Sequence, residues 1–140
     1  MTEEIVIDRK AYETIRQHAL ETYPHECCGL LFKHRESILD AEPVKNVVRP
    51  GGAAEHYHMD PMEVYAIEER KELEGLNTAG VFHSHPNKPA ILSEKDDRLM
   101  IPGLVYVILS VKDRKLKDIQ AYIKPAAEMK ARRLEIRSTD

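Results

Sequence analysis

The sequence predicts a single three-layer α/β domain in which helices flank a mixed β-sheet. Helical and strand patterns alternate along the 140 residues, and a chain of this length suits one domain with one core. Hydrophobic residues make up 42% of the chain, which is enough to fill that core. The continuous apolar run over residues 104–111 is typical of a central strand that is buried on both faces.

The first part of the chain is expected to form a helix followed by two strands. Asp8 can cap the helix, and Pro24 ends it. The apolar face of this helix follows a helical period through Ala11, Tyr12, Ile15, Ala19 and Thr22. The strands cover residues 28–33 and 37–48, and Pro43 interrupts the second strand and favours a bulge there.

Two further helices are expected after residue 60. Pro61 starts the first of them, which runs to about Glu74 and is closed by Gly75. Ser93 starts a short helix toward Met100, and a Pro-Gly pair ends it.

The remaining strands complete the sheet. They cover residues 78–83 and 104–111, and a turn at residues 113–117 leads into a partner strand that ends near Ile123. The charged tail over residues 126–140 fits either a short helix or a last edge strand.

The composition excludes several classes of partner. With 21 basic and 24 acidic residues the net charge is −3, so nothing indicates a nucleic-acid surface. No apolar run approaches the roughly 20 residues of a membrane span, and the charged start over residues 1–4 is not a signal peptide. Two cysteines without a disulfide framework fit a reducing compartment, so we expect a cytoplasmic location.

Two histidines and an aspartate follow the spacing H-x-H-x10-D at His83, His85 and Asp96. Residues two apart in a strand point to the same face, so both imidazoles can face one point while Ser84 faces the other way. Prolines in the intervening loop favour a stiff connection that can bring Asp96 back as a third ligand. Two imidazoles, one carboxylate and a water describe a catalytic zinc site. The same ligands suit other divalent metals, so zinc is a preference.

An explanation without metal fits the same residues. A pair of histidines at a strand end can simply be two polar residues on one face. The run Ser93-Glu94-Lys95-Asp96 also fits the capping box S-x-x-[DE] at the start of a helix. Both interpretations stay open on these residues alone.

A second motif lies far upstream, in Tyr23-Pro-His-Glu-Cys-Cys-Gly-Leu-Leu-Phe32. The combination of P-x-E-x-C-G-L-L with H-S-H-P and a following S-x-x-D resembles the JAMM, or MPN-plus, metalloprotease family, and specifically its short prokaryotic members. Residues 57–63 and 103–110 extend the resemblance, which covers roughly residues 1–125.

The resemblance implies the JAMM/MPN fold, which is distantly similar to the cytidine deaminase fold. It also implies a catalytic domain over residues 1–125, with residues 126–140 as a charged extension of the same domain. The deaminase signature H-x-E followed by P-C-x-x-C is missing, and so is H-E-x-x-H.

The resemblance further implies a role for each site residue. His83, His85 and Asp96 would bind one zinc ion with a bound water, and Glu26 would be the general acid/base. Ser93 would stabilise the oxyanion. Metal binding lowers the pKa of water, and a carboxylate within hydrogen-bond reach can move the proton, so each residue type suits its role. Taken alone, Glu26 would be interpreted as a solvated surface charge.

The sequence contains further cysteines and histidines, and we expect them to have no part in metal binding or catalysis. Adjacent cysteines rarely bridge without strain, so Cys27 and Cys28 are expected to be buried free thiols at the start of a core strand. His56 and His58 are expected in a surface or cleft-edge loop, since no carboxylate follows at a matching offset. The loop over residues 49–54 is rich in chain breakers and is expected to border the active site.

The leading functional hypothesis is a zinc-dependent peptidase or isopeptidase that hydrolyses the bond after the C-terminal tail of a ubiquitin-like or sulfur-carrier protein of the β-grasp type. A hydrolase of small amides or unrelated peptides is an alternative, as is a binding module that retains zinc for structure alone. No nucleic-acid or membrane partner is expected, and a homodimer is among the assemblies that the sequence allows. Long insertions for polyubiquitin recognition have little room in this chain.

Overall fold

The computed structural model describes residues 3–48 and 57–139. Within them, strands and helices follow the order β1 (Glu4–Asp8), α1 (Arg9–Thr22), β2 (Cys28–His34), β3 (Ser37–Val44), α2 (Pro61–Leu73), β4 (Asn77–Pro86), α3 (Glu94–Leu99), β5 (Val105–Lys112), β6 (Lys115–Ile123) and β7 (Arg132–Thr139). The loop over residues 49–54 and His56, for which the sequence suggested a position near the site, lie outside the described residues. No helix in the described ranges is long and apolar enough to cross a membrane.

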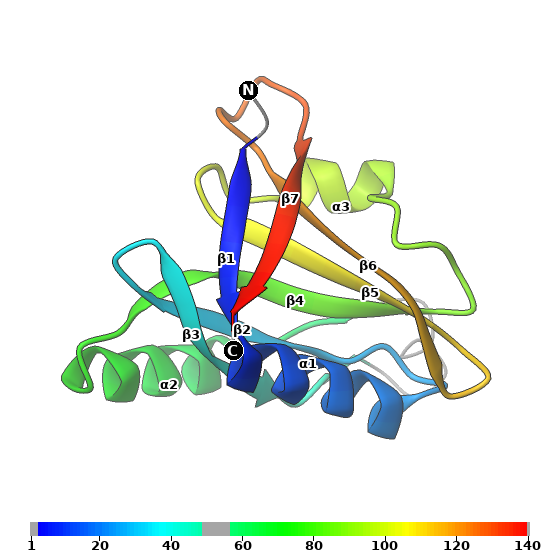
Figure 1. Ribbon diagram of the computed structural model, residues 1–140, viewed down its shortest axis with the longest axis horizontal. Helices are drawn as coiled ribbons and strands as arrows, with labels where there is room; N and C mark the ends of the chain where they lie inside the picture. The colour runs from blue at the N-terminus through cyan, green and yellow to red at the C-terminus, as the bar shows by residue number, and fades with distance from the viewer. Residues whose placement is uncertain (1–2, 49–56, 140) are drawn as a thin grey trace.

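The strands form one mixed sheet whose two edges meet. Their order is β1-β3-β2-β4-β5-β6-β7, and the parallel pairing of β1 with β7 closes the sheet into a barrel (Figure 1). The pairs β1–β3 and β4–β5 are also parallel, whereas the others are antiparallel. The predicted mixed sheet with flanking helices is therefore confirmed, and closure into a barrel is the feature that the sequence did not reveal.

Alternate residues of β4 belong to two different cores. Phe82 lies in a core shared with the buried face of α1, which consists of Ala11, Ile15 and Ala19. Val81 lies in a second core with Ile67 of α2. His83 follows Val81 on the α2 side of the strand because side chains two apart share a face. The pleat of β4 thus places the histidines away from α1.

The residues predicted to start and end the helices do so, with one exception at the N-terminal cap of α1. Pro61 is the first residue of α2, and the carboxylate of Asp60 caps it by accepting a hydrogen bond from Met62 N at 3.1 Å. Gly75 follows α2 with φ +82°, a conformation that glycine adopts without strain. Asp8 occupies the N-cap position of α1, but its side chain makes no capping hydrogen bond.

Two predictions for β3 need correction, and one strand was missed. β3 ends at Val44 instead of Val48, and Pro43 pairs regularly with Gly29. The irregular pairing of this hairpin lies between Phe32 and Lys33, so the bulge expected at Pro43 is wrong. β1 was not predicted at all, although Ile5 and Ile7 alternate with less buried neighbours as a short strand requires.

Residues 132–139 of the charged tail form β7, one of the strands of the barrel wall. β7 pairs with β1 over residues 4–8 and with β6 at Ala121–Ile123, so it is neither a helix nor an edge strand. Leu134 of β7 is buried in the α1-side core. The division of the chain at residue 125 stays a prediction, while the pairing shows that the last strand is part of the same barrel.

Candidate metal site

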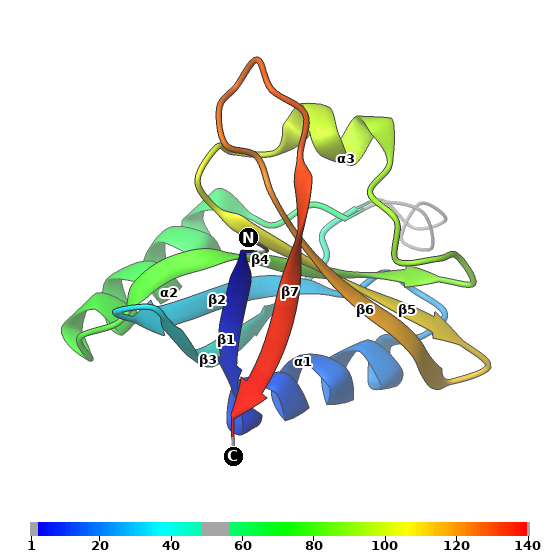
Figure 2. The same cartoon turned by 45° about the horizontal axis from the view of Figure 1, so that its top comes forward.

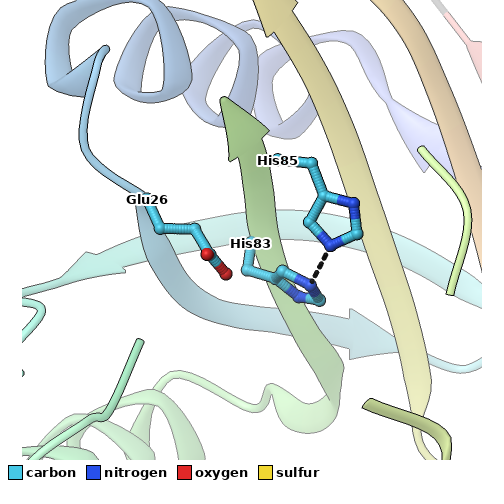
Figure 3. Close-up of side chains that lie close together, drawn as sticks. All are labelled: Glu26, His83 and His85. Carbon is cyan, nitrogen blue, oxygen red and sulfur yellow. Dashed lines mark hydrogen bonds between the residues drawn. The ribbon is translucent and has the colours of Figure 1, made fainter. Parts of the chain in front are cut away.

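The two histidines of the H-x-H motif converge because β4 extends beyond the predicted end of the strand. His83 pairs with Cys28 on β2 and Ile108 on β5, and His85 pairs with Ser110 on β5. Their Nε2 atoms lie 3.2 Å apart, and both residues are buried (Figure 3). The shared face predicted for the pair is therefore confirmed.

A hydrogen bond fixes the orientation of the His85 ring. Its Nδ1 lies 2.8 Å from the carbonyl oxygen of Pro89. A carbonyl can only accept, so Nδ1 carries the proton and Nε2 of the neutral ring presents a lone pair toward His83. An outer partner of this kind is usual for histidines that bind metal.

His83 is held by an aromatic ring instead. Its Nδ1 atom is buried and has no hydrogen-bond partner among the described residues. The ring stacks on Tyr57, with centroids 4.6 Å apart and an angle of 23° between the planes. Tyr57 had no signal in the sequence beyond its place in the segment before α2.

Asp96 reaches the histidine pair from α3. Its Oδ2 lies 3.6 Å from His83 Nε2 and 3.4 Å from His85 Nε2. Burial alone would raise the pKa of the Asp96 carboxyl, but its close contacts with the two imidazoles outweigh the burial and hold that pKa well below its usual range. Asp96 is thus a carboxylate at neutral pH.

The spacing of three atoms, Nε2 of His83, Nε2 of His85 and Oδ2 of Asp96, fits the coordination shell of one small metal ion. Ligand atoms about 2.0–2.2 Å from a tetrahedral zinc ion are separated by about 3.3–3.6 Å. The separations here are 3.2, 3.4 and 3.6 Å. Imidazole nitrogen and carboxylate oxygen are also ligand types that zinc accepts. The donor set therefore fits a divalent ion of this size.

Glu26 approaches the same point from the segment before β2. Its carboxylate and one ring nitrogen of each histidine lie within 4.8 Å of one another, and Figure 3 shows the carboxylate directed toward the imidazole pair. Burial raises the pKa of Glu26 to about 7, although the charge of His85 opposes the rise. Glu26 is only 5% exposed, so its interpretation as a solvated surface charge is wrong.

Polar side chains hold the backbone around Glu26. Asn46 Nδ2 donates to the Glu26 carbonyl at 3.0 Å. Ser84 faces away from the histidines, as predicted, and its Oγ accepts from Cys27 N at 2.8 Å. These bonds tie the Glu26 segment to β4 and to the segment that follows β3. Asn46 and Ser84 were not predicted as parts of the site, because their roles depend on contacts between distant segments.

Ser93 is the N-cap residue of α3. Its Oγ accepts from Asp96 N at 2.9 Å, and Asp96 Oδ2 lies 3.5 Å from Ser93 N, so the capping box is formed. The same carboxylate oxygen therefore faces both the cap and the histidines. The two interpretations of this motif, a helix cap and a ligand position, are compatible.

The other candidates are structural. Cys27 and Cys28 are buried free thiols, as predicted, and burial raises the pKa of each to about 12. Both stay protonated at neutral pH, and a protonated thiol is a poor metal ligand. His58 is exposed, and its backbone N donates to Asn46 Oδ1, which agrees with the expected surface loop.

The fold and this cluster define the class of the protein. The family model described as prokaryotic homologs of the JAB domain matches residues 8–123, so the chain belongs to this family. A JAB1/MPN domain protein from Archaeoglobus fulgidus has the same fold, with a TM-score of 0.61 at 18% identity over 95% of this chain and 97% of that one. The resemblance seen in the sequence and the JAMM/MPN fold are thereby confirmed.

More similar proteins come from other prokaryotes. A protein of Desulfitobacterium hafniense solved in solution has a TM-score of 0.81 and 28% identity, covering 97% of this chain and 93% of its own. A probable TtuB-protein conjugate cleaving protease of Thermus thermophilus is 28% identical over 124 residues, which are 89% of this chain and 78% of the relative. A desampylase of Pyrococcus furiosus is 35% identical over 71 residues, or 51% of this chain. That match spans about half, 49%, of the desampylase.

Proposed function

We propose that this protein is a zinc-dependent hydrolase that cleaves the bond after the C-terminal tail of a ubiquitin-like or sulfur-carrier protein. The observation that carries the proposal is the convergence of two imidazoles and one carboxylate, 3.2–3.6 Å apart, beside the buried carboxylate of Glu26. His83, His85 and Asp96 would hold the ion. Zinc bound there supplies Lewis acidity and lowers the pKa of coordinated water to about 7.

The two carboxylates differ in a way that supports two roles. A metal ligand must be deprotonated, and the pKa of Asp96 lies well below its usual range. A general base works best with a pKa near the operating pH, and the pKa of Glu26 is raised to about 7. We therefore assign metal binding to Asp96, and assign to Glu26 the transfer of a proton from water to the leaving amine.

Ser93 is the proposed oxyanion donor. A hydroxyl can accept one hydrogen bond and donate another, and its Oγ already accepts from the backbone of Asp96. The exposed side chain of Ser93 lies at the start of the helix that carries Asp96. Its O–H group can thus contact a substrate oxygen without loss of the helix cap, and this contact would strengthen as negative charge develops.

The names of the relatives support the substrate class. One is a desampylase and another is a probable protease of TtuB-protein conjugates. We infer that this chain also acts on a small protein modifier, bound by its extended tail. Main-chain hydrogen bonds beside a sheet edge are a general way to bind such a segment.

The test is cleavage of modifier fusions by the zinc-loaded protein. Linear and isopeptide-linked fusions of a ubiquitin-like protein are incubated with the wild type, with Glu26→Gln and with Glu72→Gln, an exposed carboxylate on α2 that serves as the control. We expect Glu26→Gln to lower kcat about 100-fold or more, because it cannot accept a proton. Glu72→Gln should retain the wild-type rate.

Three other outcomes would contradict the proposal. Cleavage that persists undiminished in Glu26→Gln or after full chelation would show that the assigned mechanism is wrong. Turnover of short amides with none on any fusion would favour a small-amide hydrolase. Tight zinc binding without turnover on any tail substrate, and unfolding on His83→Ala, would indicate a binding module that keeps zinc for structure.

A further inference from the structure

The helix that carries Asp96 has little packing of its own. α3 is six residues long, and none of its residues is buried. Both views show it apart from α1 and α2, beside the connection between β6 and β7 (Figure 2). A short exposed helix is marginal in isolation, so contacts from outside must hold Asp96 near the histidines.

Three side chains supply such contacts, one from β5, one from β6 and one from the residue after β6. Each of three side chains donates a hydrogen bond to a main-chain carbonyl of the segment between β4 and the end of α3. The bonds are Ser110 Oγ to Lys88 O at 2.6 Å, Tyr122 OH to Ala90 O at 2.7 Å and Lys124 Nζ to Asp97 O at 2.7 Å. The barrel thus holds the whole segment from the loop to α3 by its backbone.

Lys124 makes the contact nearest to the metal ligand. Its side chain is only 9% exposed, and its Nζ lies 2.8 Å from Asp97 Oδ1 as well as donating to the Asp97 carbonyl. Asp97 directly follows Asp96, and its Oδ2 lies 3.5 Å from Ala131 N. One buried ammonium group therefore binds both the backbone and the side chain of the neighbour of Asp96.

We infer that Lys124 is a positioning residue for Asp96, which holds α3 so that the Asp96 carboxylate stays within binding distance of the same ion as His83 and His85. This inference rests on the metal site of the proposed function. Loss of Lys124 would leave the polar groups of Asp97 without their main partner and free α3 to shift. A small displacement of Asp96 is enough to weaken a three-ligand site.

Lys71 offers a matched control. It is the other lysine of the described residues that is buried, with a side chain that is 7% exposed. It forms an ion pair with Asp40, and its Nζ lies 3.7 Å from Glu42, on β3. None of these partners belongs to the metal site. Lys71→Met therefore removes a comparable buried ion pair with no link to Asp96.

The experiment compares zinc binding in the full-length wild type, Lys124→Met and Lys71→Met. Zinc affinity is measured by competition with a chromophoric chelator, Co²⁺ absorption reports ligand geometry, and thermal unfolding without metal reports the stability of the fold. We expect Lys124→Met to weaken zinc binding roughly 10- to 100-fold, the range found when a direct outer partner of a metal ligand is lost, and to change the Co²⁺ spectrum. Lys71→Met should lower the Tm and leave both metal readouts unchanged.

The readouts separate this inference from the proposed function. Wild-type affinity and an unchanged Co²⁺ spectrum in Lys124→Met, with only a lower Tm, would overturn the positioning role and leave the metal site intact. A wild type that binds no zinc would overturn both. If Lys124→Met does not fold, Lys124→Gln takes its place, because the shorter side chain keeps a polar end but cannot reach Asp97 in the same way.

Discussion

His83 and His85 lie on the same face of β4, yet their rings are held by different interactions. The ring of His85 is oriented by a 2.8 Å hydrogen bond to a carbonyl group. The ring of His83 has no such partner among the described residues and stacks on Tyr57. Stacking of aromatic rings contributes roughly 0.5–1.5 kcal/mol beyond the burial of area. Tyr57 therefore supplies, by packing, the orientation that a hydrogen bond supplies for His85.

Replacement of Tyr57 tests this difference. We expect Tyr57→Leu to weaken zinc binding about 2- to 10-fold, the equivalent of the stacking energy, because the His83 ring gains rotational freedom. Tyr57→Phe keeps the ring and should bind zinc as the wild type does. Equal affinities for the Leu and Phe variants, measured by chelator competition, would mean that stacking does not orient His83.

The ion pair of Asp40 and Lys71 contributes to the way stability responds to acid. Burial alone would raise the pKa of Asp40, but the hydrogen bond from Lys71 outweighs it, so the pKa is lowered on folding. A carboxyl with a lowered pKa stabilises the fold above its unfolded pKa of about 3.9, and this stabilisation is lost as pH falls through the folded value. The ion pair should therefore stabilise the fold at neutral pH and fail in acid.

The variant Asp40→Asn isolates the contribution of this ion pair to the free energy of unfolding. At pH 7 we expect the variant to be less stable than the wild type by roughly 1.5–3 kcal/mol, the value of a hydrogen bond to a charged group. The difference should start to shrink below about pH 4, where the carboxyl of the unfolded chain becomes protonated, and should be lost as pH falls through the lowered pKa of the folded state. Urea unfolding at a series of pH values measures it, and a difference that stays constant down to pH 2 would rule out this linkage.

At the scale of elements, β4 depends on a close approach to β5. Gly80 pairs with Val105, and a Cβ atom at position 80 would lie 1.8 Å from the Val105 carbonyl oxygen. No side chain can occupy that space without separation of the two strands. The strand that carries both histidines is thus packed against its neighbour at a position where only glycine fits.

Gly80→Ala should therefore destabilise the fold by about 3 kcal/mol, at the upper end of what overpacking costs. Gly75→Ala is the control, because a Cβ there meets no atom within 4 Å and the cost comes only from its φ of +82°. That cost is about 1–2 kcal/mol. Denaturant unfolding shows which of the two variants is less stable. A Gly80→Ala variant that is as stable as Gly75→Ala would contradict the close approach of β4 to β5.

At the scale of the whole molecule, local patterns were predictable and distant pairings were not. The period of α1, the proline at the start of α2 and the capping box of α3 all depend on neighbours in sequence, and the structure confirms them. β1 and β7 pair with each other from opposite ends of the chain. That pairing leaves no local pattern, so the closed barrel was missed.

The candidate site shows the same contrast between local patterns, which were predictable, and contacts of distant segments, which were not. The spacing of His83 and His85 predicts their shared face from the strand period alone. Glu26 entered only through the family resemblance, because the pairing of β2 with β4 is what brings it to the histidines. Tyr57, Asn46 and Lys124 contact the site or its supports from other segments, and their residue types carry no signal for such contacts.

The central claim, that His83, His85 and Asp96 bind one zinc ion, is tested most directly by X-ray absorption of the zinc-loaded protein together with its metal content. We predict one zinc per chain, two imidazole ligands, and nitrogen or oxygen neighbours at about 2.0–2.2 Å. The Asp96→Ala variant should lose the bound metal. A sulfur neighbour at about 2.3 Å, which would indicate Cys27 or Cys28, or a wild-type protein without bound zinc, would contradict the account.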